Sequence, residues 1–129
     1  FEVWETLVHV PLFVRLPGVA PRRIDEPRSA LDLAPTILEL LGLAPEPSFR
    51  GVSLVPELYG GDAPPRDVLV DLPATSDSAR RRALVRGRYK LIVYENDNLA
   101  RLFDLESDPG ELRPITQGEV FTEMRARYR

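Results

Sequence analysis

The stretch RALVRGRYKLIVYENDNLARLFDL, residues 82–105, decides the fold of this chain. It holds three short runs of leucine, β-branched and aromatic residues, separated by Gly87 and by the turn-forming triplet Asn96-Asp97-Asn98. This pattern predicts a β-hairpin that turns near Arg86-Gly87, a second turn at the triplet and a third strand. The run DVLVDL (67–72) predicts one more strand ahead of them. The second half of the chain is therefore predicted to be an antiparallel meander of three or four strands.

Helical periodicity appears in DLAPTILELLGL, residues 32–43. Pro35 lacks an N–H and is tolerated only in a first helical turn, so we expect Asp32 to be the N-cap and Gly42 to follow the helix end. One face of this helix is apolar and is predicted to be buried: Leu33, Ile37, Leu40 and Leu41. The last stretch, 119–129, also predicts a helix. Its shared apolar face consists of Val120, Phe121 and Met124.

The run 8–16 is short, apolar and rich in β-branched residues, which predicts a strand that is buried on both faces. Pro11 cannot donate to a strand ladder, so the strand would be an edge there or begin after it. No parallel partner for it is evident in the chain. We therefore expect its neighbours in a missing N-terminal part, and oligomerisation or aggregation through this strand when that part is absent.

Length and composition limit the possible classes of protein. The 129 residues suit one compact α+β domain, and the net charge of −3 implies no polyanionic partner. Arg80-Arg81-Arg82 is the densest basic run, and no aromatic residues interleave with it as in a nucleic-acid surface. No apolar run approaches the roughly 20 residues that span a bilayer, so we expect a soluble chain and leave its compartment open. Because it begins at Phe1 and its one methionine is Met124, we expect it to be part of a longer protein.

Few residues could carry chemistry. The chain has no cysteine, and its one histidine, His9, lies in the apolar run, where a packing or surface role is favoured over catalysis. An acidic turn after the last strand could offer oxygen ligands to Ca²⁺, although its Pro-Gly pair favours turn formation, with an open turn over 107–110. Its acids are Asp104, Glu106, Asp108 and Glu111. We predict no catalytic and no metal-ligating residue in this chain and leave substrate-binding residues unassigned.

Four short blocks stand in a fixed order along the sequence. The first is an aromatic–Glu pair followed by Val-Pro-Leu: Trp4, Glu5, Val10, Pro11 and Leu12. The second is an Asp-Leu-x-Pro-Thr helix with a Gly-x-Ser-Leu element behind it: Asp32, Leu33, Pro35, Thr36, Leu41, Gly42, Gly51, Ser53 and Leu54. The last two are a Tyr-Lys-Leu-Ile strand and an aromatic-Asp-Leu strand with an Asp-Pro-x-Glu turn: Tyr89, Lys90, Leu91, Ile92, Phe103, Asp104, Leu105, Asp108, Pro109 and Glu111. Together they resemble the C-terminal portion of a sulfatase-type, arylsulfatase-like hydrolase of the alkaline phosphatase superfamily.

The resemblance implies an α/β parent protein, with residues 1–66 as the end of its large domain and 67–129 as a C-terminal antiparallel subdomain. It also implies a formylglycine nucleophile and a divalent cation, calcium or another, in the missing N-terminal catalytic part. This chain would then be inactive alone. Lys90 matches a strand motif, where a structural role with the amine reaching the surface is expected, and the Trp4-Glu5 pair is expected to brace a loop by packing. Related phosphodiesterases and phosphonate monoester hydrolases share these motifs, and a non-catalytic α+β interaction module is a further alternative.

Overall fold

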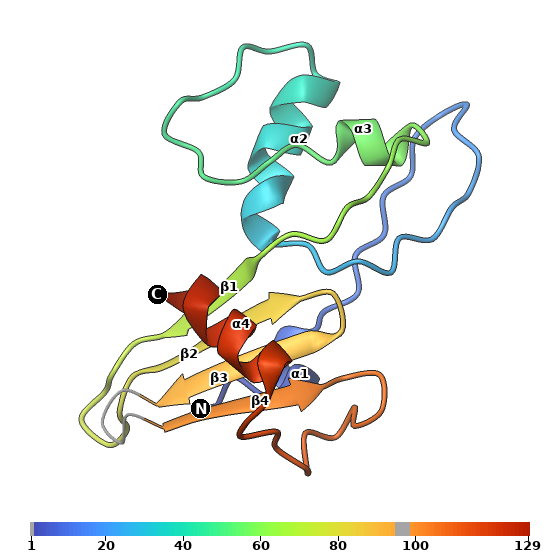
Figure 1. Cartoon of the computed structure of the whole chain (residues 1–129). Helices are drawn as coiled ribbons and strands as arrows, with labels where there is room; N and C mark the ends of the chain where they lie inside the picture. Colours follow the sequence, from blue (N-terminus) through green and yellow to red (C-terminus); the bar gives the residue numbers. More distant parts are fainter. Residues whose placement is uncertain (1, 95–98) are drawn as a thin grey trace. The chain divides into compact units, whose positions relative to one another are not determined.

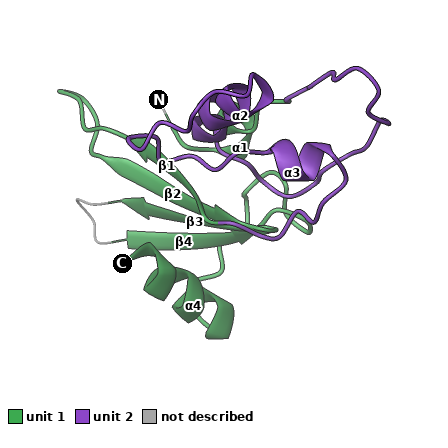
Figure 2. Cartoon of the chain, turned by 90° about the horizontal axis from the view of Figure 1, so that it is seen from above, with its two compact units in different colours: residues 1–11, 67–129 green, residues 12–66 purple. Residues whose placement is uncertain are grey.

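The computed structural model describes residues 2–94 and 99–129 (Figure 1). The chain forms two compact units: Phe1–Pro11 with Asp67–Arg129, called the sheet unit below, and Leu12–Arg66, called the helical unit (Figure 2). The chain thus leaves the sheet unit early and returns to it. The predicted division at residue 66, which concerns the domains of a longer protein, stays a prediction.

Four strands form one antiparallel sheet in the order β1-β2-β3-β4. Their bounds are β1 Val68–Leu72, β2 Arg81–Arg86, β3 Tyr89–Tyr94 and β4 Leu99–Asp104. The α+β class and the meander are confirmed, while the turn predicted at 96–98 lies outside the described residues. Arg86 pairs with Tyr89, so the hairpin turn is Gly87-Arg88. Gly87 has φ +52°, a left-handed value that the first position of a tight hairpin turn favours in glycine.

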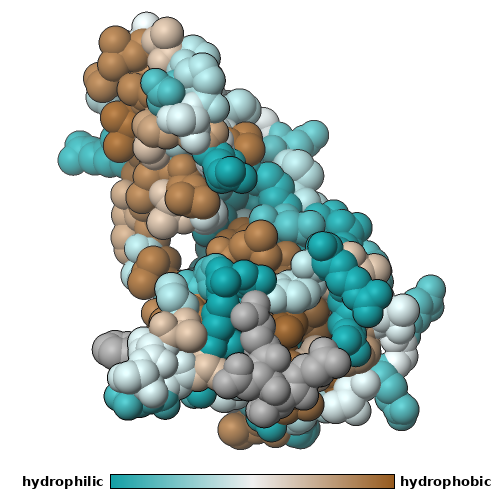
Figure 3. All heavy atoms as spheres, turned by 90° about the vertical axis from the view of Figure 1, so that its left-hand side faces the viewer, coloured by the Kyte–Doolittle hydropathy of each residue, from teal (hydrophilic) through white to brown (hydrophobic). Residues whose placement is uncertain are grey.

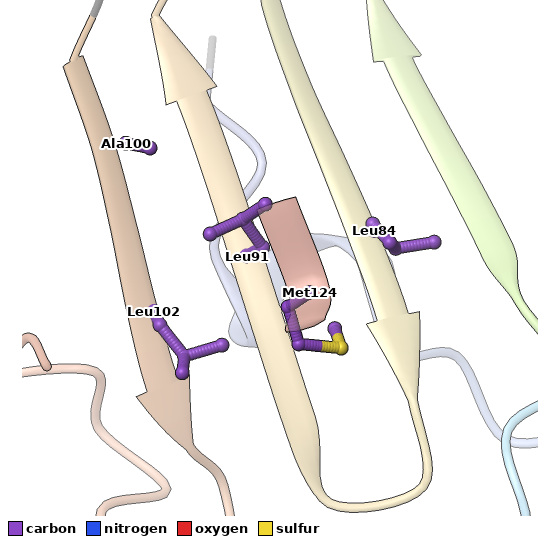
Figure 4. Packing of buried hydrophobic residues seen from close by; sticks show 5 residues of the cluster. All are labelled: Leu84, Leu91, Ala100, Leu102 and Met124. Atoms are coloured by element: carbon purple, nitrogen blue, oxygen red, sulfur yellow. The ribbon is translucent and has the colours of Figure 1, made fainter. Parts of the chain in front are cut away.

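The sheet is covered on one face by α4, Glu119–Tyr128, which confirms the predicted terminal helix. Met124 of this helix reaches the strands, as Figure 4 shows, and Val120 and Phe121 pack beside it. The buried cluster on this face consists of Leu84, Leu91, Ala100, Leu102 and Met124.

The opposite face buries a second cluster of Val3, Ala83, Ile92 and Phe103. The N-terminal segment covers it: Trp4 lies edge-on to Phe103, with ring centroids 6.0 Å apart. A short helix, α1 (Glu5–Val8), follows directly. Because successive side chains of a strand alternate between the two faces, Lys90 of β3 lies on the same face as Ile92.

The helical unit contains a 3-10 turn, η1 (Ala30–Asp32), and two helices, α2 (Leu33–Leu40) and α3 (Val55–Leu58). The predicted helix is confirmed, but its cap lies earlier, because Ser29 and Asp32 form a reciprocal capping box around η1. The predicted end is confirmed by Gly42, which has φ +66°. The N–H of Leu43 donates to the Leu38 carbonyl at 2.9 Å, which completes a Schellman motif.

The prediction of a buried apolar face on α2 is wrong for this chain. Ile37 and Leu41 are 55% and 67% exposed, Leu33 is 36% exposed and Leu40 is half-buried. The physical reason is a lack of apolar cover, because Leu54 is the single buried hydrophobic residue described within 12–66. Figure 3 shows apolar atoms gathered on the surface of this unit, at the top of the view.

The prediction of a strand over residues 8–16 is also wrong. The segment ends α1 at Val8 and then runs on without a strand ladder among the described residues. Val10 is 71% exposed and Phe13 91% exposed. An extended segment needs a neighbour to satisfy its backbone groups, and the described sheet is filled by the meander alone. In the described residues, no helix has the length and apolar character that crossing a bilayer requires.

Candidate functional site

A buried lysine between two glutamates lies at the centre of the sheet unit. Lys90 is fully buried, and its Nζ lies 2.9 Å from Glu5 Oε2 and 3.0 Å from Glu111 Oε1. The backbone N–H of Glu5 also donates to Glu111 Oε2. These three residues, called the lysine–glutamate cluster below, join the start of α1, the start of β3 and the loop after β4. They come from three of the four sequence blocks.

The sheet register explains why Lys90 is enclosed. It stands opposite Phe103 of β4, on the face that Val3 and Trp4 cover. The amine therefore does not reach the surface, which corrects the expectation of an outward-reaching head group. A buried ammonium needs paired charges to offset its desolvation, and the two glutamates supply them.

Glu111 is held by the turn before it. Its N–H donates to the Asp108 carbonyl at 3.0 Å, so the turn spans Asp108–Glu111 with Pro109 second and Gly110 third. The open turn predicted over 107–110 is therefore wrong by one residue. Glu111 itself has φ +53°, the single non-glycine residue with a left-handed backbone in the described part of the chain. Such strain marks a position that the surroundings enforce.

Asp108 stabilises this turn with its side chain. Its carboxylate accepts hydrogen bonds from the N–H groups of Arg113 at 2.8 Å and of Leu112 at 3.2 Å. The Arg113 N–H, followed by that of Leu112, holds the pKa of Asp108 below its ordinary value despite burial. The carboxylate is thus a backbone acceptor that keeps Glu111 in place.

The acidic turn does not gather ligands for a cation. Asp104 and Glu106 both pair with Arg88, while Asp108 binds backbone and Glu111 binds Lys90. Within residues 2–94 and 99–129, no three acidic or histidine side chains come together as a metal would require. The residues present therefore do not fit the divalent cation that the family resemblance implies.

His9 joins the lysine–glutamate cluster at the surface. Its Nδ1 lies 3.1 Å from Glu5 Oε1, and its side chain is 74% exposed. The Glu5 carboxylate thus bridges a buried lysine and an exposed imidazole. Among the described residues, the imidazole of His9 pairs with this acid and not with a serine or threonine hydroxyl.

The helical unit brings the Asp-Leu-x-Pro-Thr and Gly-x-Ser-Leu elements together. Asp32 Oδ1 accepts the Val52 N–H at 2.8 Å, and Thr36 Oγ1 accepts the Leu54 N–H at 2.8 Å. Gly51 permits the approach, since a Cβ there would lie 2.0 Å from the Leu31 carbonyl oxygen. Side-chain oxygens of the first element therefore accept backbone N–H groups of the second, and this pair of hydrogen bonds is called the polar clamp below.

Charged residues complete the interior of the helical unit. Glu57 pairs with Arg28 at 2.8 Å and with Arg66 at 3.4 Å, and Arg66 also lies 3.3 Å from Asp32. Two guanidinium groups thus face two carboxylates. A balanced network of this kind holds loops in register and leaves no excess charge for a ligand.

The arginine run likewise serves the fold of the sheet unit. Arg80 and Arg82 pair with Asp71, and Arg81 lies 3.3 Å from Glu2. The Arg80 hydrogen bond holds the pKa of Asp71 below its ordinary value. All three arginines of the run are thus paired with acidic residues of the same unit.

The sequence contained one unused signal for the lysine–glutamate cluster. The chain's one lysine sits within the apolar run YKLIV, and a charged residue in such a strand requires buried partners. Its partners Glu5 and Glu111 could not be chosen from 20 acidic residues, because the pairing depends on three distant segments. The Ser29 cap was missed because Asp32 carries the same cap chemistry.

The relatives of this chain are sulfatase-type hydrolases. The family model described as "N-sulphoglucosamine sulphohydrolase, C-terminal" matches residues 2–129. The chain belongs to this family, and the resemblance stated from its sequence blocks is confirmed.

Individual relatives agree with this assignment. A choline-sulfatase of Rhizobium meliloti (strain 1021) is 35% identical over 138 residues, which cover 97% of this chain and 27% of that protein. A solved 2-O GAG sulfatase superposes with a TM-score of 0.61 at 27% identity, over 75% of this chain and 22% of its own. The phosphonate monoester hydrolase from Silicibacter pomeroyi superposes with a TM-score of 0.65 at 25% identity. The match covers 88% of this chain and 26% of that protein. The chain spans about a quarter of the length of the curated relatives it matches.

Proposed function

We propose that this chain is the C-terminal domain of a sulfuric ester hydrolase whose chemistry is carried by residues outside it. The observation that carries the proposal is the family match over 2–129, combined with a span of about a quarter of the relatives. In the proposal, the remaining part of the protein supplies a formylglycine nucleophile and a divalent cation, calcium or another. The domain itself supports that part and contributes no metal ligand.

The exposed apolar residues of the helical unit support a partner of this kind. They include Leu12, Phe13, Leu31, Ile37 and Leu41. Surfaces of this composition are unusual on a free-standing domain and typical of interfaces. We propose the N-terminal catalytic part of the same protein as the partner. The rival interpretation, an independent interaction module, requires a stable monomer despite these residues, whereas oligomerisation or aggregation of the isolated chain favours the missing partner.

A second candidate is a phosphonate monoester or phosphodiester hydrolase. It is favoured by the likeness to the Silicibacter pomeroyi enzyme, which matches a larger share of this chain than the GAG sulfatase does. The 35% identity to a choline-sulfatase favours the sulfate ester. A sulfate ester is therefore the substrate that we propose first.

The test compares two proteins and two substrates. The full-length protein and the 129-residue chain are each assayed on an aryl sulfate and on an aryl phosphonate monoester, with and without a chelator. We expect chelator-sensitive sulfate turnover by the full-length protein and none by the chain. Faster phosphonate turnover would select the second candidate. Chelator-sensitive sulfate turnover by the chain alone would contradict the proposal.

A further inference from the structure

The lysine–glutamate cluster does more than fill the interior. Replacing a buried ion cluster with apolar residues of similar volume is often neutral or stabilising, so burial alone does not account for it. Glu111 also adopts a strained left-handed backbone to reach Lys90. Both observations indicate that the cluster fixes the position of a group that it touches. The group at its surface end is His9.

The contact with Glu5 defines which nitrogen of His9 is available. A carboxylate only accepts hydrogen bonds, so Nδ1 must carry the proton in the 3.1 Å contact with Glu5 Oε1. A neutral imidazole has one N–H, and its Nε2 then presents a lone pair on the opposite side of the ring. The anchored carboxylate therefore orients the ring and selects its tautomer, as the partners of metal-bound and catalytic histidines do.

The surroundings of His9 indicate that it faces the rest of a larger protein. Leu7 lies two positions before it and Val10 directly after it in the sequence, and they are 59% and 71% exposed. Exposed apolar side chains in the same segment as an oriented imidazole are the composition of a ligand or protein contact.

The net charge of the lysine–glutamate cluster limits which groups can bind to Nε2 of His9. The cluster holds two carboxylates and one ammonium, so it carries a net charge of −1 beside the imidazole. Such a field disfavours an anionic group, and the Nε2 lone pair accepts a hydrogen bond from an uncharged or a cationic donor. In an ester substrate the neutral donors are the hydroxyl groups of the alcohol part, and the anion is the sulfate.

We propose that His9 is a substrate-contacting residue of the complete hydrolase, with Nε2 accepting a hydrogen bond from a hydroxyl of the alcohol part, and that Glu5, Lys90 and Glu111 are its positioning residues. The substrate named in this inference rests on the proposed function. The tautomer of the His9 imidazole rests on the structure alone. It assigns alcohol-part specificity to a domain that supplies no nucleophile.

The kinetic test uses the full-length protein and two esters, a sugar O-sulfate with free hydroxyls and an aryl sulfate without them. Losing one hydrogen bond corresponds to about a three- to tenfold rise in KM, so His9→Ala should show this rise for the sugar sulfate. The kcat should change less than about twofold, since the contact is made equally in ground and transition states. The aryl sulfate should keep its KM. Glu123→Gln, which removes an exposed i,i+4 pair on α4, is the matched control.

The positioning test measures the ¹⁵N shifts of the His9 imidazole, assigned by their loss in His9→Ala. We expect the Nδ1–H tautomer in the wild type and a mixture of tautomers in Lys90→Met. Glu5→Leu should do the same and leaves Lys90 paired with Glu111, so it serves if Lys90→Met folds poorly. Glu5→Gln, whose amide oxygen still accepts, should restore the wild-type shifts and KM.

Three outcomes would overturn the inference: an unchanged KM in an active His9→Ala enzyme, a wild-type Nε2–H tautomer, or wild-type shifts in both Lys90→Met and Glu5→Leu. A wild-type protein that hydrolyses neither ester refutes the proposed function instead. The ¹⁵N shifts still decide the positioning of His9 in that case.

Discussion

The two compact units of this chain are stabilised by different physical means. The sheet unit buries leucine, isoleucine, phenylalanine and methionine side chains on both faces of its sheet, with one ion cluster among them. The helical unit buries Asp32, Thr36 and Glu57 and leaves most of its apolar side chains exposed. The sheet unit thus resembles the core of an ordinary domain, whereas the helical unit is held mainly by hydrogen bonds and ion pairs.

The difference shows which unit buries its apolar side chains within this chain. The burial of apolar surface contributes roughly 25 cal/mol per Å² and is the dominant favourable term in folding. The sheet unit buries such surface among its own residues. The helical unit keeps its loops in register by polar contacts and leaves its apolar side chains exposed, where we propose that the N-terminal catalytic part covers them. The substitutions below test this contrast, and they follow from the largest expected effect to the smallest.

Lys90→Met should give the largest loss. It leaves the buried carboxylate of Glu111 without its ammonium partner and removes one of the two partners of Glu5, and breaking a buried pair in this way costs about 3–5 kcal/mol. Chemical denaturation of the wild type and the variant measures the loss. The triple variant Lys90→Met, Glu5→Leu, Glu111→Leu removes all three charges and should regain most of the stability. A triple variant no more stable than the single one would show that the cluster contributes net stability.

Leu91→Ala and Leu41→Ala compare the apolar residues of the two units directly. Leu91 is fully buried, so its truncation should cost about 2–5 kcal/mol in the 129-residue chain. Leu41 is 67% exposed, and its truncation should stay within about 0.5 kcal/mol. In the full-length protein the Leu41 variant should rise into the range of the core leucines, because the proposed partner covers α2. Equal small losses in both proteins would contradict that cover.

Local sequence chemistry predicted much of this structure. The meander, the helix that Gly42 ends and the terminal helix all follow from signals within about ten residues, namely apolar alternation, helical spacing and glycine turns. The sheet unit could be predicted well because its strands pair with sequence neighbours.

The errors share one cause, which is burial assigned without knowledge of the partner. Residues 8–16 and the apolar face of α2 have the composition of buried elements, but composition does not say which chain buries them. The lysine–glutamate cluster was missed for a related reason. Glu5, Lys90 and Glu111 come from three segments, and nothing local to any of them specifies the other two.

Thr36→Val tests the polar clamp of the helical unit. The variant keeps the shape of the side chain and removes the oxygen that accepts the Leu54 N–H, leaving a buried donor without a partner. The expected loss is about 1–3 kcal/mol. Thr122→Val in α4 is the control, because its exposed hydroxyl donates to the carbonyl of Gly118, the N-cap of the same helix. It should change stability by no more than about 0.5 kcal/mol. Similar values for the two variants would refute the clamp.

Asp108→Asn should give the smallest effect, a loss of stability near neutral pH that disappears toward acid pH. The pKa of Asp108 is lowered from its ordinary value of 3.8, so between the two values the folded state binds fewer protons than the unfolded state. The contribution of the ionised carboxylate to stability is therefore fully present above the unfolded value and is lost as the pH falls through the folded pKa. Unfolding free energies of wild type and variant, measured from pH 6 down to about pH 2, should converge at the acid end.

Arg113→Ala shows where that dependence comes from. The largest cause of the lowered pKa is the backbone N–H of residue 113, and the charge of the Arg113 guanidinium contributes least. Alanine retains the N–H, so Arg113→Ala should keep most of the wild-type slope with pH while Asp108→Asn loses its share of it. If Arg113→Ala flattens the curve as much as Asp108→Asn does, the guanidinium rather than the backbone would hold the carboxylate. The Asp-Pro-x-Glu turn would then depend on a surface charge, and raising the salt concentration should weaken its hold on Glu111.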